Sequence, residues 1–135
     1  MEITIDFPGG SKVDAHFSGF TVQTDQPPGG GGKGSAPTPF AVFLASIGTC
    51  AGIYALDFCR ERGLATEGLR IIQNVETNQE SGMVELVGLK IELPRNFPVK
   101  YREAIIHSVE LCKVKKHIHQ PPHFEISTRE FAPAL

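Results

Sequence analysis

An uncharged and mainly apolar stretch of the chain runs from residue 39 to residue 56 and reads PFAVFLASIGTCAGIYAL. Its eighteen residues reach the lower limit of length for a membrane-spanning helix. Two glycines and the polar Ser46 and Thr49 interrupt it, and it continues directly into the charged sequence DFCRER. We therefore predict no membrane span, but a helix that is buried in protein on nearly all of its sides.

Capping residues mark the ends of this helix. Thr38 supplies a hydroxyl at the N-cap, and Pro39 follows at the first helical position, where its missing N–H costs no hydrogen bond. Gly63 is suited to the C-terminal end because glycine adopts the left-handed conformation that commonly terminates helices. The sequence thus predicts a helix from Pro39 to about Arg62.

The rest of the chain shows strand-like alternation, turn residues and one amphipathic helical segment. This order of elements indicates an α+β fold in which antiparallel sheets pack on the long buried central helix. The elements expected besides that helix are strands at 2–7 and within 12–25, a hairpin of strands 69–78 and 83–93, a helix within 98–118, and a last strand at 123–131.

A chain of 135 residues fits a single domain, which we place at residues 1–135. One thin sheet in a domain this small does not cover a helix that is apolar all round. An intertwined homodimer would supply the missing cover, and we expect one.

The segment QPPGGGGKGSAP, residues 26–37, is too rich in glycine and proline for regular structure, and we expect a flexible loop. It differs from a phosphate-binding P-loop, which needs Gly-Lys followed directly by Ser or Thr. Here Gly34 follows Lys33, and Pro27 stands where that motif has its first glycine. Nucleotide binding is therefore not predicted.

The composition of the chain indicates which classes of binding partner and which cellular compartment to expect. The net charge is −2, no basic stripe is present and tryptophan is absent, so nothing indicates nucleic-acid binding. The start, MEITIDFPGG, lacks the features of a secretion signal. Three cysteines, an odd number, argue against a secreted disulfide framework. We expect a cytoplasmic protein, in which a cysteine pair is more often redox-active than structural.

The three cysteines differ in their surroundings. Cys50 and Cys59 are nine residues apart on one expected helix, so they point to opposite faces and cannot pair. Cys50 lies between two glycines in GTCAG, which would let a substrate or another segment approach. Cys112 has three lysines within four residues, which would lower its pKa if they faced it. A redox pair of Cys50 with Cys112 and three unconnected thiols both remain open.

The C-terminal histidines offer a second set of possible ligands. Cys112, His117, His119 and His123 have the spacing C-x4-H-x-H-x3-H, which matches no familiar zinc pattern. We predict no metal site.

Two motifs nevertheless resemble one known family. In APTPFAVFLASIGTCAG, a Pro-Thr-Pro helix start comes eleven residues before Cys50. In ELCKVKKHI, Cys112 follows 62 positions after Cys50 (112 − 50), just before the last expected strand. Both motifs, and the order of elements along nearly the whole chain, resemble the OsmC/Ohr family.

The resemblance implies an intertwined homodimer of thiol peroxidases that act on organic hydroperoxides in oxidative stress defence. Cys50 would be the peroxidatic thiol, which becomes a sulfenic acid. Cys112 would be the resolving thiol, which closes a disulfide with Cys50. No cofactor is implied, because an external dithiol or a lipoylated protein would restore both thiols. Cys59 has no role in this cycle.

The sequence departs from the family at two positions. Active members use an arginine from the N-terminal half and a glutamate near the helix start. Here the helix start has no carboxylate, no arginine precedes Arg60, and the upstream cations are Lys12, Lys33 and His16. An alternative is therefore a binding protein without turnover, in which Phe40, Phe43 and Tyr54 line an apolar pocket.

Overall fold

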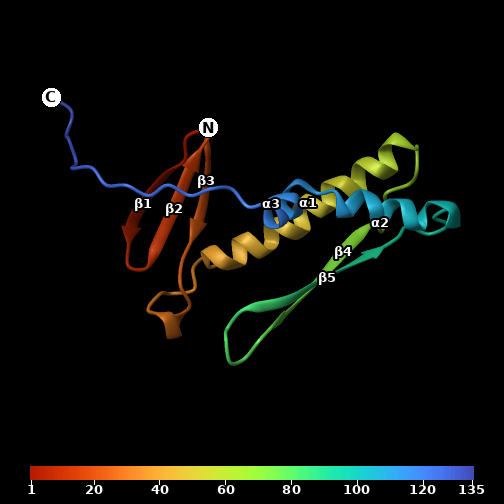
Figure 1. Ribbon diagram of the computed structural model, residues 1–135, viewed down its shortest axis with the longest axis horizontal. Helices are drawn as coiled ribbons and strands as arrows, with labels where there is room; N and C mark the ends of the chain where they lie inside the picture. Colours follow the sequence, from red (N-terminus) through yellow and green to blue (C-terminus); the bar gives the residue numbers. More distant parts are fainter.

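The computed structural model describes residues 1–135 and is built from two antiparallel sheets, three α-helices and two short 3-10 helices (Figure 1). One sheet has the strand order β1-β2-β3 and the other is the hairpin β4-β5. The α+β class is as predicted. In chain order the elements are β1 (Thr4–Gly9), β2 (Lys12–Phe17), β3 (Phe20–Thr24), η1 (Pro28–Gly30), α1 (Pro39–Glu61), β4 (Arg70–Thr77), β5 (Val84–Glu92), η2 (Val99–Tyr101), α2 (Arg102–Glu110) and α3 (Lys113–His119).

The three-stranded sheet lies beside the N-terminal end of α1 and contributes no side chain to the buried core (Figure 1). Its β2–β3 hairpin turns on Ser18 and Gly19, which both have positive φ, of 49° and 79°. Such a two-residue turn matches the twist of the paired strands. The prediction that both sheets pack on the long helix is wrong for this sheet, because it is joined to α1 only through the loop 25–38.

The helix α1 begins and ends close to the expected residues. The Thr38 hydroxyl accepts a hydrogen bond from the Ala41 N–H at 3.2 Å, and Pro39 takes the first helical position. At the other end Arg62 is the C-cap, and Gly63 follows with φ +62°. The local capping signals therefore determine both ends of the helix.

The burial of α1 differs from the prediction. Only one face is buried, with Ile47, Ala51, Ala55 and Phe58 spaced three or four residues apart. Ile53 on the opposite side is 46% exposed. The prediction of burial on nearly all sides is wrong for the single chain, because β4, α2 and α3 reach one side of α1 only. By length and composition alone α1 could cross a membrane, a test that core helices of soluble proteins also pass.

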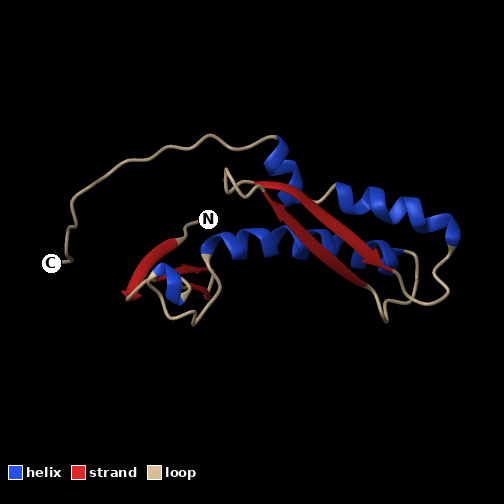
Figure 2. Cartoon of the chain, turned by 90° about the horizontal axis from the view of Figure 1, so that it is seen from below, coloured by secondary structure: helices blue, strands red, loops and turns tan.

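The core lies where α1, the β4–β5 hairpin and α2 meet, and Figure 2 shows the hairpin lying along α1. The ring of Phe58 on α1 meets the ring of Tyr101 edge to face, with centroids 5.9 Å apart. Leu89 and Ile91 of β5 pack against this cluster from the sheet. Its buried members are Ala51, Ala55, Phe58, Cys59, Phe97, Ile105 and Val109.

The C-terminal part of the chain contains two departures from the expected elements. The helix expected within 98–118 is divided, because Cys112 has an extended backbone (φ −58°, ψ 142°) and caps α3. The strand expected at 123–131 does not form, and these residues are exposed and extended (Figure 2). A strand needs the edge of another strand for its hydrogen bonds, and the single chain brings no free edge to this segment.

The loop 26–37 is organised around the carboxylate of Asp25, which is 1% exposed. This carboxylate accepts hydrogen bonds from the backbone N–H groups of Gln26, Lys33 and Ser35 and from the Ser35 hydroxyl. The hydrogen bonds, above all those from Ser35, lower the pKa of Asp25 to about 2. The flexibility of this loop stays a prediction.

Candidate functional site: a pair of thiols between two helices

The structure places the three cysteines in different surroundings, and all three are free thiols. Cys50 lies in the middle of α1 and is partly exposed. Cys112 is 0% exposed and lies in the break between α2 and α3. Cys59 is also fully buried, near the end of α1. Cys50 is thus the one cysteine that a molecule from solution can reach.

The fold brings Cys50 and Cys112 together although 62 positions separate them in the chain (112 − 50). Burial is the main cause that raises the pKa of the Cys112 thiol. The neighbouring Cys50 raises it further, through its charge and through a hydrogen bond between the two thiols. Two thiols in such contact can be joined by a disulfide once one of them is oxidised.

Two groups of α3 oppose this rise. The N–H of Lys115 donates a hydrogen bond to Cys112 Sγ at 3.4 Å, and the positive charge of Lys115 also lowers the pKa of Cys112. The sequence indicated that nearby lysines would lower this pKa if they faced the thiol. Lys115 does lower the pKa of Cys112, but burial outweighs its contribution.

Cys59 is separated from this pair and belongs to the buried core cluster. Burial raises the pKa of its thiol, and Arg62 opposes that rise. The Arg62 guanidinium lies 3.7 Å from the centre of the Phe58 ring and donates to the Phe58 carbonyl at 3.2 Å. Cys59 therefore fills space in the core, as the sequence indicated.

Small residues of α1 next to Cys50 allow the hairpin to approach closely. The Gln73 side chain of β4 donates to the Leu44 carbonyl at 2.9 Å. A Cβ atom added at Gly48 would lie 2.4 Å from Gln73 Oε1. Gly48 thus permits this contact between sheet and helix, two residues before the thiol.

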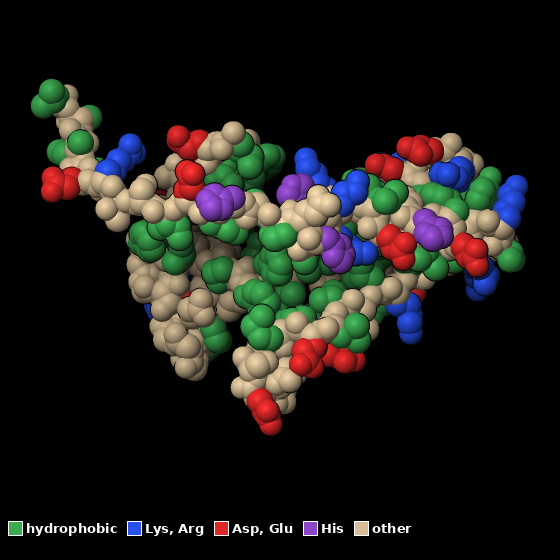
Figure 3. Space-filling view, viewed as in Figure 1, with side chains coloured by type: hydrophobic (Ala, Val, Ile, Leu, Met, Phe, Trp, Pro, Cys, Tyr) green, Lys and Arg blue, Asp and Glu red, His purple; other side chains and the backbone are tan.

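A cavity of about 760 Å³ lies between β5, α2 and α3, and Ile47 forms its wall on α1. Figure 3 shows apolar side chains gathered in this hollow. The residues expected to line an apolar pocket, Phe40, Phe43 and Tyr54, do not line it. Its walls are formed by Ile47, Glu85, Val87, Leu89, Ile91, Leu93, Arg102, Ile105, Ile106, Val109, Glu110, Lys115, Ile118 and His119.

The sequence did not predict that several of these residues line a cavity. The helical spacing of Ile105 and Val109 indicated an apolar face, but nothing in the sequence showed that strand β5 lies opposite this face. Lys115 could not be told apart from Lys113 and Lys116, because their contacts depend on the rotation of α3.

The four possible C-terminal ligands do not come together. Cys112 is buried, whereas His117, His119 and His123 are exposed, and His117 Nδ1 is bonded to the Lys113 carbonyl at 2.7 Å. These four residues form no group in which the ligand atoms come close together.

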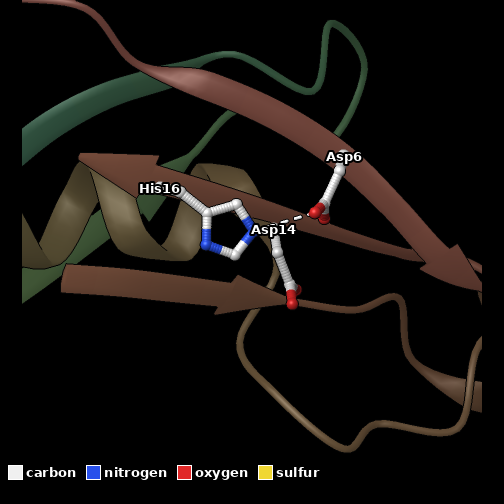
Figure 4. Close-up of side chains that lie close together, drawn as sticks. All are labelled: Asp6, Asp14 and His16. Carbon is white, nitrogen blue, oxygen red and sulfur yellow. Dashed lines mark hydrogen bonds and ion pairs between the residues drawn. The ribbon is translucent and has the colours of Figure 1, made fainter. Parts of the chain in front are cut away.

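One other group, on the three-stranded sheet, has metal-type donors: Asp6, Asp14 and His16, with ligand atoms within 4.8 Å of one another (Figure 4). His16 Nε2 lies 2.9 Å from Asp6 Oδ2, and Nδ1 lies 3.0 Å from the Thr21 hydroxyl. Asp6 and Asp14 face each other in the strand register. Both ring nitrogens of His16 already have hydrogen-bond partners, so neither is free to bind a metal ion.

Comparison with known proteins shows the family of this chain. The family model described as OsmC-like protein matches residues 31–127, which include both Cys50 and Cys112. The chain belongs to the OsmC-like family. No curated protein is similar enough in sequence to give a match.

Solved structures of similar fold extend over most of the OsmC-like chain. A protein of Psychrobacter arcticus described as an osmotic stress induced and detoxification response protein has a TM-score of 0.74 at 20% identity, covering 87% of both chains. The OsmC like protein of Mycoplasma pneumoniae has a TM-score of 0.69 at 14% identity, covering 89% of this chain and 87% of the other. An organic hydroperoxide resistance protein OsmC of Legionella pneumophila, also described as a predicted redox protein, has a TM-score of 0.54 at 17% identity, covering 87% and 89%.

The upstream cations of this OsmC-like chain lie away from the thiol pair. His16 is held on the outer sheet by Asp6 and Thr21, and Lys12 begins β2 of the same sheet. The backbone N–H of Lys33 is bonded to Asp25 in the loop. Lys115 is the one cation whose charge acts on Cys112.

Proposed function

We propose that this OsmC-like protein is a cysteine-based peroxidase that reduces organic hydroperoxides in the cytoplasm as part of oxidative stress defence. The observation that carries the proposal is the contact between Cys50 and Cys112, which both lie within the residues that the family model matches. The difference in their exposure supports different roles: Cys50 can meet a substrate, and the fully buried Cys112 cannot.

In the proposed cycle the Cys50 thiolate attacks the peroxide oxygen that is distal to the organic group. The O–O bond breaks, the alcohol leaves with a proton, and Cys50 becomes a sulfenic acid. The Cys112 sulfur then attacks the Cys50 sulfur, a disulfide forms and water leaves. An external dithiol, free or on a lipoylated protein, restores both thiols by exchange and is itself oxidised to a disulfide.

We further propose that the active form is a homodimer. The N-terminal end of α1 leaves Phe40 and Phe43 about half exposed, with the centres of their stacked rings 5.6 Å apart. Phe124 and Ile126 of the C-terminal segment are 76% and 95% exposed. A second copy of the chain would remove this apolar surface from water. Sedimentation of the reduced protein at micromolar concentration would give twice the chain mass, and a single-chain mass would contradict the dimer.

The test of the peroxidase begins with fully reduced protein and a few equivalents of cumene hydroperoxide. We expect the loss of two free thiols and a Cys50–Cys112 bridge in the peptide masses. Cys50→Ser and Cys112→Ser should each abolish the bridge, while Cys59→Ser is the matched control and should form it normally. Hydrogen peroxide in a parallel run reports the preference for organic substrates.

Two results would contradict the proposal. One is a Cys50 that stays reduced for hours, and the other is a Cys50 that reacts no faster than the buried Cys59. Sustained consumption of hydroperoxide with dithiothreitol present then measures whether turnover follows the first oxidation.

A further inference from the structure

The three-stranded sheet has one apolar face and one polar face. Residues paired across neighbouring strands lie on the same face, and successive rows alternate between the two faces. Ile5, Ala15 and Val22 form an apolar row across the three strands. The rows on either side of it point to the opposite face and are polar: Thr4, His16 and Thr21, and Asp6, Asp14 and Gln23. This is the pattern of a sheet that packs on another layer through one face.

The single chain leaves the apolar face of this sheet open. No residue of β1, β2 or β3 belongs to the core cluster or packs against it. Figure 2 shows the sheet beyond the N-terminal end of α1, away from the core. Ile5 is 51% exposed, and Phe7 and Phe20 are 76% and 67% exposed. Exposed apolar surface that is gathered on one face in this way marks a site of protein contact.

The loop that connects the sheet to α1 is closed at its base. The Asp25 N–H donates a hydrogen bond to the Pro37 carbonyl at 3.2 Å, so the two ends of the loop 26–37 meet. The Asp25 carboxylate holds the interior of the loop through the N–H groups of Lys33 and Ser35. Stretched out, the twelve residues of the loop would reach about 40 Å, which exceeds the length of about 35 Å of the 23-residue helix α1. An open loop would therefore let the sheet fold back along its own helix, and the closed loop prevents this.

The helix α1 also carries apolar surface that the single chain leaves open. Ile53, on the side away from the core, is 46% exposed, and Phe40 and Phe43 at the N-terminal end are 54% and 44% exposed. The segment 39–56 has no charged side chain that would oppose contact with an apolar layer. The chain thus contains two open apolar surfaces that suit each other, and its own loop keeps the sheet from covering its own helix.

We propose that the loop closed on Asp25 is a hinge that places the three-stranded sheet of one chain on α1 of a second copy. This inference rests on the proposed homodimer and names the surfaces that meet in it. The exchange is mutual, because a twofold axis brings the same pair of surfaces together twice.

The exposed apolar area agrees with what a stable dimer needs. The four exposed phenylalanines of the two surfaces are Phe7, Phe20, Phe40 and Phe43, with exposed fractions from 44% to 76%. At about 200 Å² for a fully accessible phenylalanine, they expose about 500 Å² per chain. Two copies offer about 1,000 Å² from these side chains alone, which is most of the area of about 1,200 Å² at which specific interfaces begin.

The first experiment identifies the chain that the sheet contacts. Phe7→p-benzoylphenylalanine places a photo-crosslinker on the apolar face, and Gln23→p-benzoylphenylalanine is the matched control on the polar face. Equal amounts of isotope-labelled and unlabelled protein are unfolded together, refolded and irradiated, and the linked peptides are identified by mass. We expect links from residue 7 to residues 39–56, about half of them joining a labelled to an unlabelled chain, and no such links from residue 23. Links that join only peptides of the same isotope would place the sheet on its own helix and overturn the inference.

The second experiment addresses the hinge. Asp25→Ala removes the carboxylate that closes the loop, and Gly29→Ala is the matched control, because an added Cβ there meets no atom within 4 Å. In sedimentation at micromolar concentration, Gly29→Ala should keep twice the chain mass, and Asp25→Ala should show single-chain mass, because the freed sheet reaches its own α1. The links from residue 7 to α1 should persist in Asp25→Ala, with the labelled–unlabelled share below that of wild type. A share that stays at half in Asp25→Ala would overturn the role of the loop as the hinge.

The failure of this inference and the failure of the proposed function are distinguishable. A wild type with single-chain mass contradicts the homodimer and this inference together. A wild-type dimer in which residue 7 gives no link to α1 of the other chain overturns this inference and leaves the homodimer in place. Formation of the Cys50–Cys112 bridge tests the peroxidase separately, because both cysteines belong to the same chain.

Discussion

Closing the Cys50–Cys112 bond should change the stability of the whole protein by an amount that follows from the chain length between the two residues. Linking residues 62 positions apart (112 − 50) removes conformational freedom from the unfolded chain. For a loop of this length the entropy model gives about 4 kcal/mol of added stability. The two thiols are already neighbours in the reduced state.

The assay is urea unfolding of oxidised and reduced protein at one protein concentration, followed by circular dichroism. With a urea dependence of about 2 kcal/mol per molar, the oxidised form should unfold at about 2 M higher urea. Cys112→Ser treated with the same oxidant is the control and should show no shift. An oxidised wild type that unfolds at the same or lower urea would refute the reasoning, because the native structure would then be strained by the bond.

Three further predictions concern the fold around the site. Phe58→Ala should lower the free energy of unfolding by about 3–5 kcal/mol, because it empties the core and removes the contact with Tyr101, whereas Phe58→Leu should cost clearly less in the same urea titration. Wild type should lose stability as the pH falls from about 4 to about 2, because the pKa of Asp25 is lowered from 3.8 to about 2 in the folded state. In acid unfolding curves Asp25→Asn should lack this loss, and at neutral pH it should be less stable than wild type. Gly32→Ala should destabilise the loop, since its Cβ would lie 2.0 Å from the Gln26 carbonyl oxygen. Its loop should be cleaved by protease faster than that of the control Gly29→Ala, where the added Cβ meets no atom within 4 Å.

Local signals in the sequence predicted the fold well wherever neighbouring residues decide the structure. Thr38 and Pro39 set the start of α1, and the hairpin expected at 69–78 and 83–93 is observed as Arg70–Thr77 and Val84–Glu92. These elements depend on capping and alternation, which act over a few residues.

Features that depend on distant partners were not predictable in the same way. The strand expected at 123–131 has the right alternation but no neighbouring edge in the single chain. Cys112 breaks the expected helix because its sulfur is buried and caps α3, which the sequence of ELCKVKK does not reveal. The candidate site was identified through the spacing of Cys50 and Cys112, while the position of Lys115 required the rotation of α3.

The two sulfurs belong to parts of the molecule with different stiffness. Cys50 lies in the middle of a 23-residue helix, whereas Cys112 lies in the two-residue break that joins α2 to α3. A disulfide between them would link the α2–α3 connection to the long helix α1 and restrict the angle at which α3 leaves α2. Because residues 120–135 follow α3 directly, the oxidation state of the pair would be transmitted to the C-terminal segment as a change in its range of motion.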